Sequence, residues 1–411
     1  MSRLMFKTKR YWLYIGLGFF VICFVGSALV QISSVDATGG IETYIPCVSK
    51  SGAPAENDEY VVIGWNDLGM HCYDLDYSVM AVLPPYNTLW AQVIQRGDPP
   101  EILTSGIEVE YSFPDNTYSV GKTNFWDYED KLFGVNLASN VGLTGKGLSG
   151  EMDFITDHFE ADGIPLTEYS DSDLSTPEYL QLAKIEVKDL SGNLLAQSDV
   201  VAPVSSEMRC DKCHTKPDPN NFRMNILLGH DDEAETNLAA QAASGDPVLC
   251  ADCHADPALG KPGNPELPSL SAVMHEKHKE RANDCYDCHP GPDTKCLRGT
   301  MANDYDMTCT DCHVGGMEAL SDEDRTPWMD EPRCDDCHDA QHAENPDTLF
   351  RFSKGHGGLY CESCHNSTHA ILPSRDGRDN LQSTALQGHA GTIEVCTVCH
   401  LTDPGAGGPH K

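Results

Sequence analysis

The C-terminal half of the chain contains one short pattern seven times: two cysteines three positions apart, with a histidine directly after the second. The seven copies begin at Cys210, Cys250, Cys285, Cys309, Cys334, Cys361 and Cys396. No other two cysteines in the sequence have this spacing. Fourteen of the 18 cysteines and seven of the 17 histidines belong to the pattern. One kind of chemistry therefore dominates this half of the chain.

The pattern is the attachment signal for c-type haem. Its two thiols add to the vinyl groups of the porphyrin, and the adjacent imidazole binds the iron from the proximal face. Zinc knuckles also use paired cysteines, but they do not need a histidine after every second cysteine. The sequence thus predicts seven covalently bound haem c groups. The second cysteines are Cys213, Cys253, Cys288, Cys312, Cys337, Cys364 and Cys399, and the proximal ligands are His214, His254, His289, His313, His338, His365 and His400.

The second axial ligand of each iron decides whether a haem passes electrons or binds a substrate. Eight further histidines lie after residue 205, whereas only His71 and His158 lie in the first 200 residues. We predict that seven of the eight are distal iron ligands: His230, His275, His278, His342, His356, His369 and His389. His410 lies next to the C-terminus, so we expect it to be a solvated tail residue.

The positions of these histidines restrict which haem each one serves. His275 and His278 are three apart on an expected helix, so they share a face and can serve two different haems. His342 and His369 each follow a proximal histidine by four positions, one helical turn along the same face, so each can only reach a neighbouring haem. A preceding glycine allows close approach of the backbone to a porphyrin. The histidines with such a glycine are His230, His356 and His389.

The composition divides the exported chain in two, and the predicted fold class is α+β with more than one domain. Residues 59–205 contain short β-branched and aromatic runs bounded by turn residues, which predicts a β-sandwich-like domain. The expected strands are 60–65, 88–94, 106–113, 182–187 and 194–204. Residues 206–411 provide only about 29 residues per haem. We expect packed haems to form the core there, surrounded by short helices and irregular chain.

Residues 1–37 are typical of a signal peptide or a signal anchor, because basic residues precede an uncharged stretch at 11–32. Its 22 residues are enough to span a bilayer, which takes about 20, while Val35-Asp36-Ala37 could be cleaved. Residues 38–58 are expected to be a linker. Both alternatives place the remainder outside the cytoplasm. The protein is then periplasmic, anchored in the inner membrane by residues 11–32, or at the cell surface after cleavage.

Three cysteines of the exported part lie outside the seven motifs: Cys47, Cys72 and Cys296. They allow one intrachain disulfide at most, and the sequence does not select the pair. Cys72 also lies in an acidic segment that offers metal ligands, namely Asp67, His71, Cys72, Asp74 and Asp76. Alternatively, His71 could be the distal ligand of a haem. We favour a different interpretation, a strand-to-loop turn in which Asp67 and Asp74 cap backbone groups and Cys72 joins a disulfide.

The formal net charge is −35 at pH 7, and acidic residues occur throughout the chain. Nucleic acids and anionic lipid headgroups are therefore poor partners, whereas a basic redox protein would be attracted over a long range. The expected partners are other cytochromes or a membrane quinol oxidoreductase, further copies of the same chain, and the membrane if residues 11–32 are retained.

Residues 206–411 resemble the multihaem c-type cytochromes of anaerobically respiring bacteria. The segments 64–74 and 83–87 are similar to a signature in the N-terminal domains of one group of these exported proteins. The resemblance implies electron transfer in an anaerobic respiratory chain and no catalytic residues. The alternative is a multihaem oxidoreductase that reduces a nitrogen or sulfur oxyanion at one open-faced haem. Seven regular motifs and enough distal histidines favour electron transfer.

Overall fold

The computed structural model describes residues 59–405 and 410, all of which belong to one compact unit. Both strands and helices are present, which confirms the α+β class. The predicted leader at 1–37 and linker at 38–58 lie outside the described residues. Within the part that the structure describes, no helix has the length and hydropathy needed to cross a bilayer.

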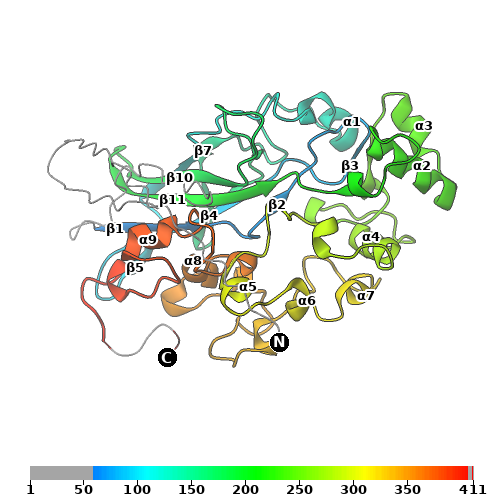
Figure 1. Cartoon of the computed structure of the whole chain (residues 1–411). Helices are drawn as coiled ribbons and strands as arrows, with labels where there is room; N and C mark the ends of the chain where they lie inside the picture. Colours follow the sequence, from blue (N-terminus) through cyan, green and yellow to red (C-terminus); the bar gives the residue numbers. More distant parts are fainter. Residues whose placement is uncertain (1–58, 406–409, 411) are drawn as a thin grey trace, which may run out of the picture. The chain divides into compact units, whose positions relative to one another are not determined.

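Two five-stranded sheets form the first part of the fold (Figure 1). The first sheet has the order β1 (Tyr60–Trp65), β4 (Thr88–Gln95), β9 (His158–Asp162) and β8 (Asp153–Ile155), with β5 (Glu101–Leu103) also paired to β4. The second has the order β2 (His71–Cys72), β11 (Leu194–Ser205), β10 (Leu180–Asp189), β6 (Ile107–Ser112) and β7 (Ser149–Glu151). All five expected strands are confirmed.

The two sheets share one hydrophobic core. Val62, Leu89 and Ala91 of the first sheet pack with Ile185 and Val200 of the second. Buried residues alternate along β10, because successive side chains of a strand point to opposite faces. The two sheets therefore face each other, as the spacing of the strands predicted.

The outer face of the first sheet is covered as well. Val61, Ile63 and Ile94 form a cluster with Val398 of the last cysteine motif. Because β1 is buried on both faces, its sequence is continuously apolar from Val61 to Trp65, without the alternation of a half-exposed strand. The C-terminal half of the chain thus packs directly on the sheet.

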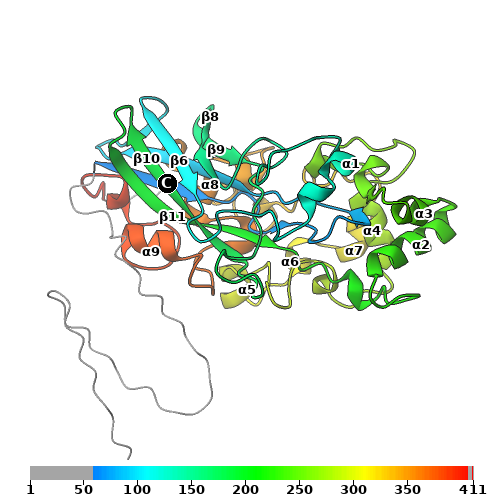
Figure 2. The same ribbon diagram turned by 90° about the horizontal axis from the view of Figure 1, so that it is seen from above.

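The helices are short, and most lie after residue 205. They are α1 (Glu129–Phe133), α2 (Phe222–Ala234), α3 (Leu238–Ala243), α4 (Leu270–His278), α5 (Thr300–Asp304), α6 (Cys309–Cys312), α7 (Gly316–Leu320), α8 (Cys361–His365) and α9 (Leu381–Gln387). Figure 1 shows the chain from α4 to α9 below the sheets, with α2 and α3 at one end, and Figure 2 shows α9 and the pair α2 and α3 at opposite ends of the described chain. A two-stranded parallel pair, β3 (Met80–Ala81) with β12 (Val248–Leu249), joins the two parts near α3.

Candidate functional site

Each of the seven cysteine–histidine motifs folds as a single helical turn. In the first, the His214 N–H donates to the Cys210 carbonyl at 2.9 Å, and the same bond recurs in the motifs of His254, His289, His313, His338 and His400. The motif of His365 is the α-helix α8. Residues three and four apart share one face of such a turn. Both thiols and the imidazole of a motif can therefore face the same planar group.

The second cysteine of most motifs is open to solvent. Cysteine is among the most frequently buried residue types, yet five of these thiol-bearing residues are exposed: Cys213, Cys253, Cys288, Cys312 and Cys337. The glycines that precede three predicted distal histidines also have open space beside them. Apart from the adjacent residues and the glycine's own helix backbone, no atom lies within 4 Å of the position that a Cβ would take at Gly229, Gly355 and Gly388. Both observations fit the approach of a large flat group.

Imidazole rings from distant parts of the sequence lie side by side in this region. Four predicted distal histidines each lie next to a proximal one. The distances between ring centroids are 6.4 Å for His230 and His254, 6.1 Å for His275 and His289, 6.1 Å for His278 and His214, and 6.0 Å for His356 and His400. Residues up to 64 positions apart are thus brought together in matched pairs.

These distances fit two imidazoles on opposite sides of one metal ion. An imidazole nitrogen binds a first-row metal at about 2 Å. In a five-membered ring with bonds of about 1.33 Å, each nitrogen lies about 1.1 Å from the centre. Two collinear ligands then have ring centres about 6.2 Å apart. The four pairs agree with this value without rearrangement, so the donor set fits bis-histidine haem iron.

In three of these imidazoles the hydrogen bonds are made by Nδ1, so that Nε2 is available to bind a metal. On α4, the Nδ1–H of His275 donates to the Ser271 carbonyl and that of His278 to the Met274 carbonyl, both at 2.7 Å. His254 donates likewise from Nδ1 to Pro268 at 2.9 Å. A carbonyl only accepts, so each Nε2 keeps its lone pair for a metal. Such partners orient a ligating imidazole and raise its basicity.

His410 corrects one expectation. Its ring centroid lies 5.9 Å from that of His365 and 5.3 Å from that of His342, and the residue is half-buried. It is therefore not a solvated tail residue. The position of His410 near the C-terminus did not predict its burial, because His410 lies against the sixth motif.

The other three predicted distal ligands, His369, His342 and His389, have surroundings that differ from those of the four paired histidines. The ring of His369 bonds to Cys296 and to the Leu68 backbone, and the neighbouring Cys296 raises the pKa of this imidazole. His342 lies beside His410 rather than beside a proximal histidine. Nδ1 of His389 lies 3.1 Å from the Ala390 carbonyl oxygen. Within residues 59–405 and 410, no imidazole ring forms a close pair with His313, His338, His369 or His389.

Interactions between their thiols show which motifs are neighbours. Burial, followed by Asp74 and Cys288, raises the pKa of the Cys210 thiol to about 11. This interaction makes the first and third motifs neighbours, and an ion pair between Lys212 and Asp287 joins the same two turns. Each further neighbouring pair also has interacting thiols. These pairs are Cys250 with Cys210, Cys285 with Cys309, Cys312 with Cys337, Cys334 with Cys361, and Cys364 with Cys399.

The acidic segment after β1 is a capped turn. The Asn66 side chain accepts the backbone N–H of Leu68 and of Gly69, at 3.2 and 2.9 Å. Asp74 accepts two N–H groups of the chain near Leu83, which confirms its predicted capping role. Asp67 instead contacts Nε2 of His71 at 3.2 Å, so the capping role predicted for Asp67 was wrong. In the described chain, these side chains form no metal-ligand group.

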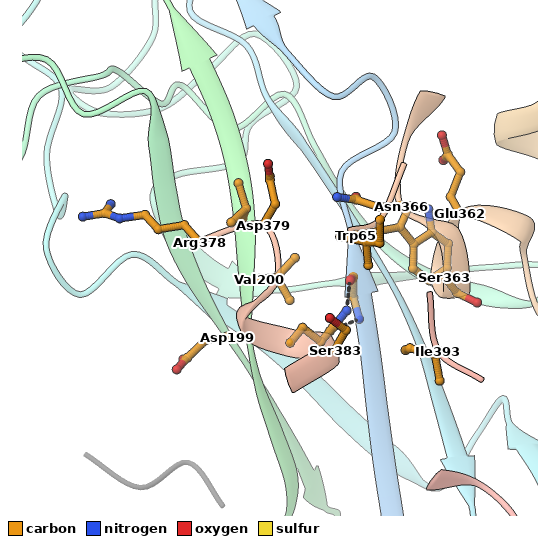
Figure 3. Close-up of a pocket in the computed structure, with 14 residues that line it drawn as sticks. Trp65, Asp199, Val200, Glu362, Ser363, Asn366, Arg378, Asp379, Ser383 and Ile393 are labelled. Atoms are coloured by element: carbon orange, nitrogen blue, oxygen red, sulfur yellow. Dashed lines mark hydrogen bonds between the residues drawn. The ribbon is translucent and has the colours of Figure 1, made fainter. Parts of the chain in front are cut away.

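A small pocket marks the junction between β1 and the helix of the sixth motif (Figure 3). Trp65 on β1 lies beside Glu362 of α8, whose pKa is raised well above its usual range by burial and then by Asp67. Gln382 of α9 accepts the Gly64 N–H and donates to the Gly64 carbonyl, both at 2.8 Å. The strand β1 therefore contacts α8 through Trp65 and is hydrogen-bonded to α9 through Gly64.

No family model, curated protein or solved structure matches this chain.

Proposed function

We propose that the protein is a heptahaem c-type cytochrome that transfers electrons. The observation that carries the proposal is the set of paired imidazoles at 6.0–6.4 Å, which includes His278 with His214. Bound haem c supplies reversible one-electron chemistry at iron. An iron with two imidazoles has no open position, so its task is transfer rather than substrate binding.

The following residues of the chain would hold the seven proposed haems. The motif cysteines tether each macrocycle, and the histidine of each motif is the proximal ligand. The distal ligands are His278 for the first motif, His230 for the second, His275 for the third, His410 for the sixth and His356 for the seventh. For the fourth we assign no distal ligand, because within the described residues no imidazole forms a close pair with His313.

One helix fixes two neighbouring sites. His275 and His278 of α4 face the third and the first motif, as the three-residue spacing predicted. The two motif turns are themselves joined by Lys212 and Asp287. A rigid helix with locked imidazole tautomers holds the two ligand sets at a fixed separation. This arrangement supports electron transfer between adjacent groups.

The electrostatic interactions between thiols also support an order of the proposed haems in space. Numbered by their place in the sequence, the motifs follow each other as second, first, third, fourth, fifth, sixth and seventh. Electrons would enter and leave at the second and the seventh group. We propose that a basic redox protein docks at one of these ends, either another cytochrome or a membrane quinol oxidoreductase, because the chain carries a net charge of −35.

A second candidate function follows from the fourth and fifth motifs. Neither His313 nor His338 has a close imidazole partner within the described residues, unlike the other five proximal histidines. A haem with one histidine keeps an open distal face. The protein would then be a multihaem oxidoreductase that reduces a nitrogen or sulfur oxyanion at one of these two groups.

Two measurements on the exported holoprotein test these proposals. Intact mass should show seven added macrocycles, and bound zinc without macrocycles would contradict both functions. Low-temperature EPR then separates them. Electron transfer predicts that every iron is low-spin and unreactive towards nitrite, cyanide and CO. A single high-spin iron that binds these ligands favours the oxidoreductase.

The proposed location is outside the cytoplasm. Haem is attached to such motifs after export, and the segments at 1–37 are typical of an exported chain. Haem-stained fractions of inner membrane, periplasm and cell surface should show the protein in one of the three. Staining confined to the cytoplasm would contradict the location.

A further inference from the structure

Two cysteines outside the haem motifs come together in the fold. Cys72 is the last residue of β2, and Cys296 lies in the segment after the third motif. Both are half-buried free thiols, and burial and then the neighbouring Cys296 raise the pKa of the Cys72 thiol. They are 224 positions apart in the sequence, so only the tertiary fold makes them neighbours.

Contacts on both sides of Cys296 hold the two segments in register. Ser205, the β11 partner of Cys72, bonds through its hydroxyl to Thr294 at 3.0 Å. On the other side, Arg298 donates from Nη1 to the Gly69 carbonyl at 2.7 Å. The residues two before and two after Cys296 thus anchor it against β11, the strand paired with β2, and against the turn that leads into β2.

We propose that Cys72 and Cys296 form a disulfide that links the β-sheets to the C-terminal half. The two S–H bonds break and one S–S bond forms. Two electrons and two protons pass to the disulfide of a thiol oxidase in the exported compartment, which is thereby reduced to a dithiol. Disulfides persist in such compartments. This inference does not depend on the function of the haem motifs.

Peptide mapping of the holoprotein tests the bridge directly. The protein is purified without reductant, denatured in iodoacetamide and digested with trypsin. Cleavage after Lys50, Arg96, Lys295 and Arg298 places Cys47, Cys72 and Cys296 in three different peptides. We expect residues 51–96 joined to residues 296–298, with Cys47 alkylated. Reductant should separate the pair but leave haem thioethers intact. Alkylation of both Cys72 and Cys296 before reduction would overturn the inference, as would a link to Cys47.

Three variants provide an independent readout. Cys72→Ser and Cys296→Ser should lower the melting temperature by equal amounts, and the double variant should lower it no further, because all three remove the same bond. If the two single effects add in the double variant, the cysteines act separately and the bridge is refuted. Peptide mapping of the unmodified protein decides the question even where a variant fails to accumulate.

Discussion

The buried ion pair between Arg298 and Asp379 supports a quantitative prediction. The guanidinium donates from Nε to one carboxylate oxygen at 2.6 Å and from Nη2 to the other at 3.0 Å. The side chains are 3% and 0% exposed. Nη1 also bonds the Gly69 carbonyl, so this one residue connects three segments of the chain. The surrounding carboxylates, Asp379 first among them, raise the pKa of Arg298 and keep it charged.

Replacing Arg298 with methionine leaves the Asp379 carboxylate buried with only the Ser374 hydroxyl as a side-chain partner. Removing one member of a buried pair costs about 3 to 5 kcal/mol, and each lost hydrogen bond about 1 kcal/mol. We expect Arg298→Met to lower the free energy of unfolding by about 4 kcal/mol. The double variant with Asp379→Leu should regain at least about 2 kcal/mol, because no unpaired charge remains buried.

Guanidinium unfolding followed by far-ultraviolet circular dichroism measures these differences. Arg378→Met is the matched control, since Arg378 pairs with Glu178 at 2.9 Å but both side chains are about 40% exposed. This control should change stability by less than about 1 kcal/mol. If Arg298→Met and Arg378→Met have equal effects, or if the double variant loses more than Arg298→Met alone, the reasoning is refuted.

Three further predictions concern single histidines. His278→Ala should make one of the seven proposed haems high-spin and able to bind CO, and an unchanged EPR spectrum would refute its pairing with His214. His71→Ala should leave the haem spectrum unchanged, because its Nε2 is bonded to Asp67 at 3.2 Å, and a shifted spectrum would show that His71 is a ligand. Burial lowers the pKa of His158 from 6.5 to about 4, so the unfolded chain takes up the proton first as pH falls. Stability is then full above pH 6.5 and decreases by about 3 kcal/mol towards pH 4, at about 1.4 kcal/mol per unit, and His158→Gln should flatten this slope in urea titrations.

The sequence was sufficient for the regular parts of the fold. The strand-forming runs became β1, β4, β6, β10 and β11 because their β-branched residues fit a pleated, buried surface. It did not reveal that β1 and β4 are covered on their outer side. That contact depends on residues such as Gln382 and Val398, which lie some 300 positions away and have no local pattern.

The candidate site was predicted in its composition but not in its pairing. Local spacing identifies every motif, since the chemistry requires two thiols and an imidazole on one turn. Which imidazoles meet is decided by the tertiary fold, as with His230 and His254 or His365 and His410. The sequence contains a signal for the capping role of Asn66, because asparagine side chains often cap the turn in which they lie. The sequence prediction assigned this role to the neighbouring aspartates instead.

The proposed order of the motifs has a consequence for damage to the protein. If electrons pass only between successive groups, loss of an inner group, such as the one at His289, would divide the proposed path into two separate parts. Loss of the group at His254 or at His400 would only shorten it. The proposed electron transfer should therefore tolerate damage at the two ends of the path better than at its centre.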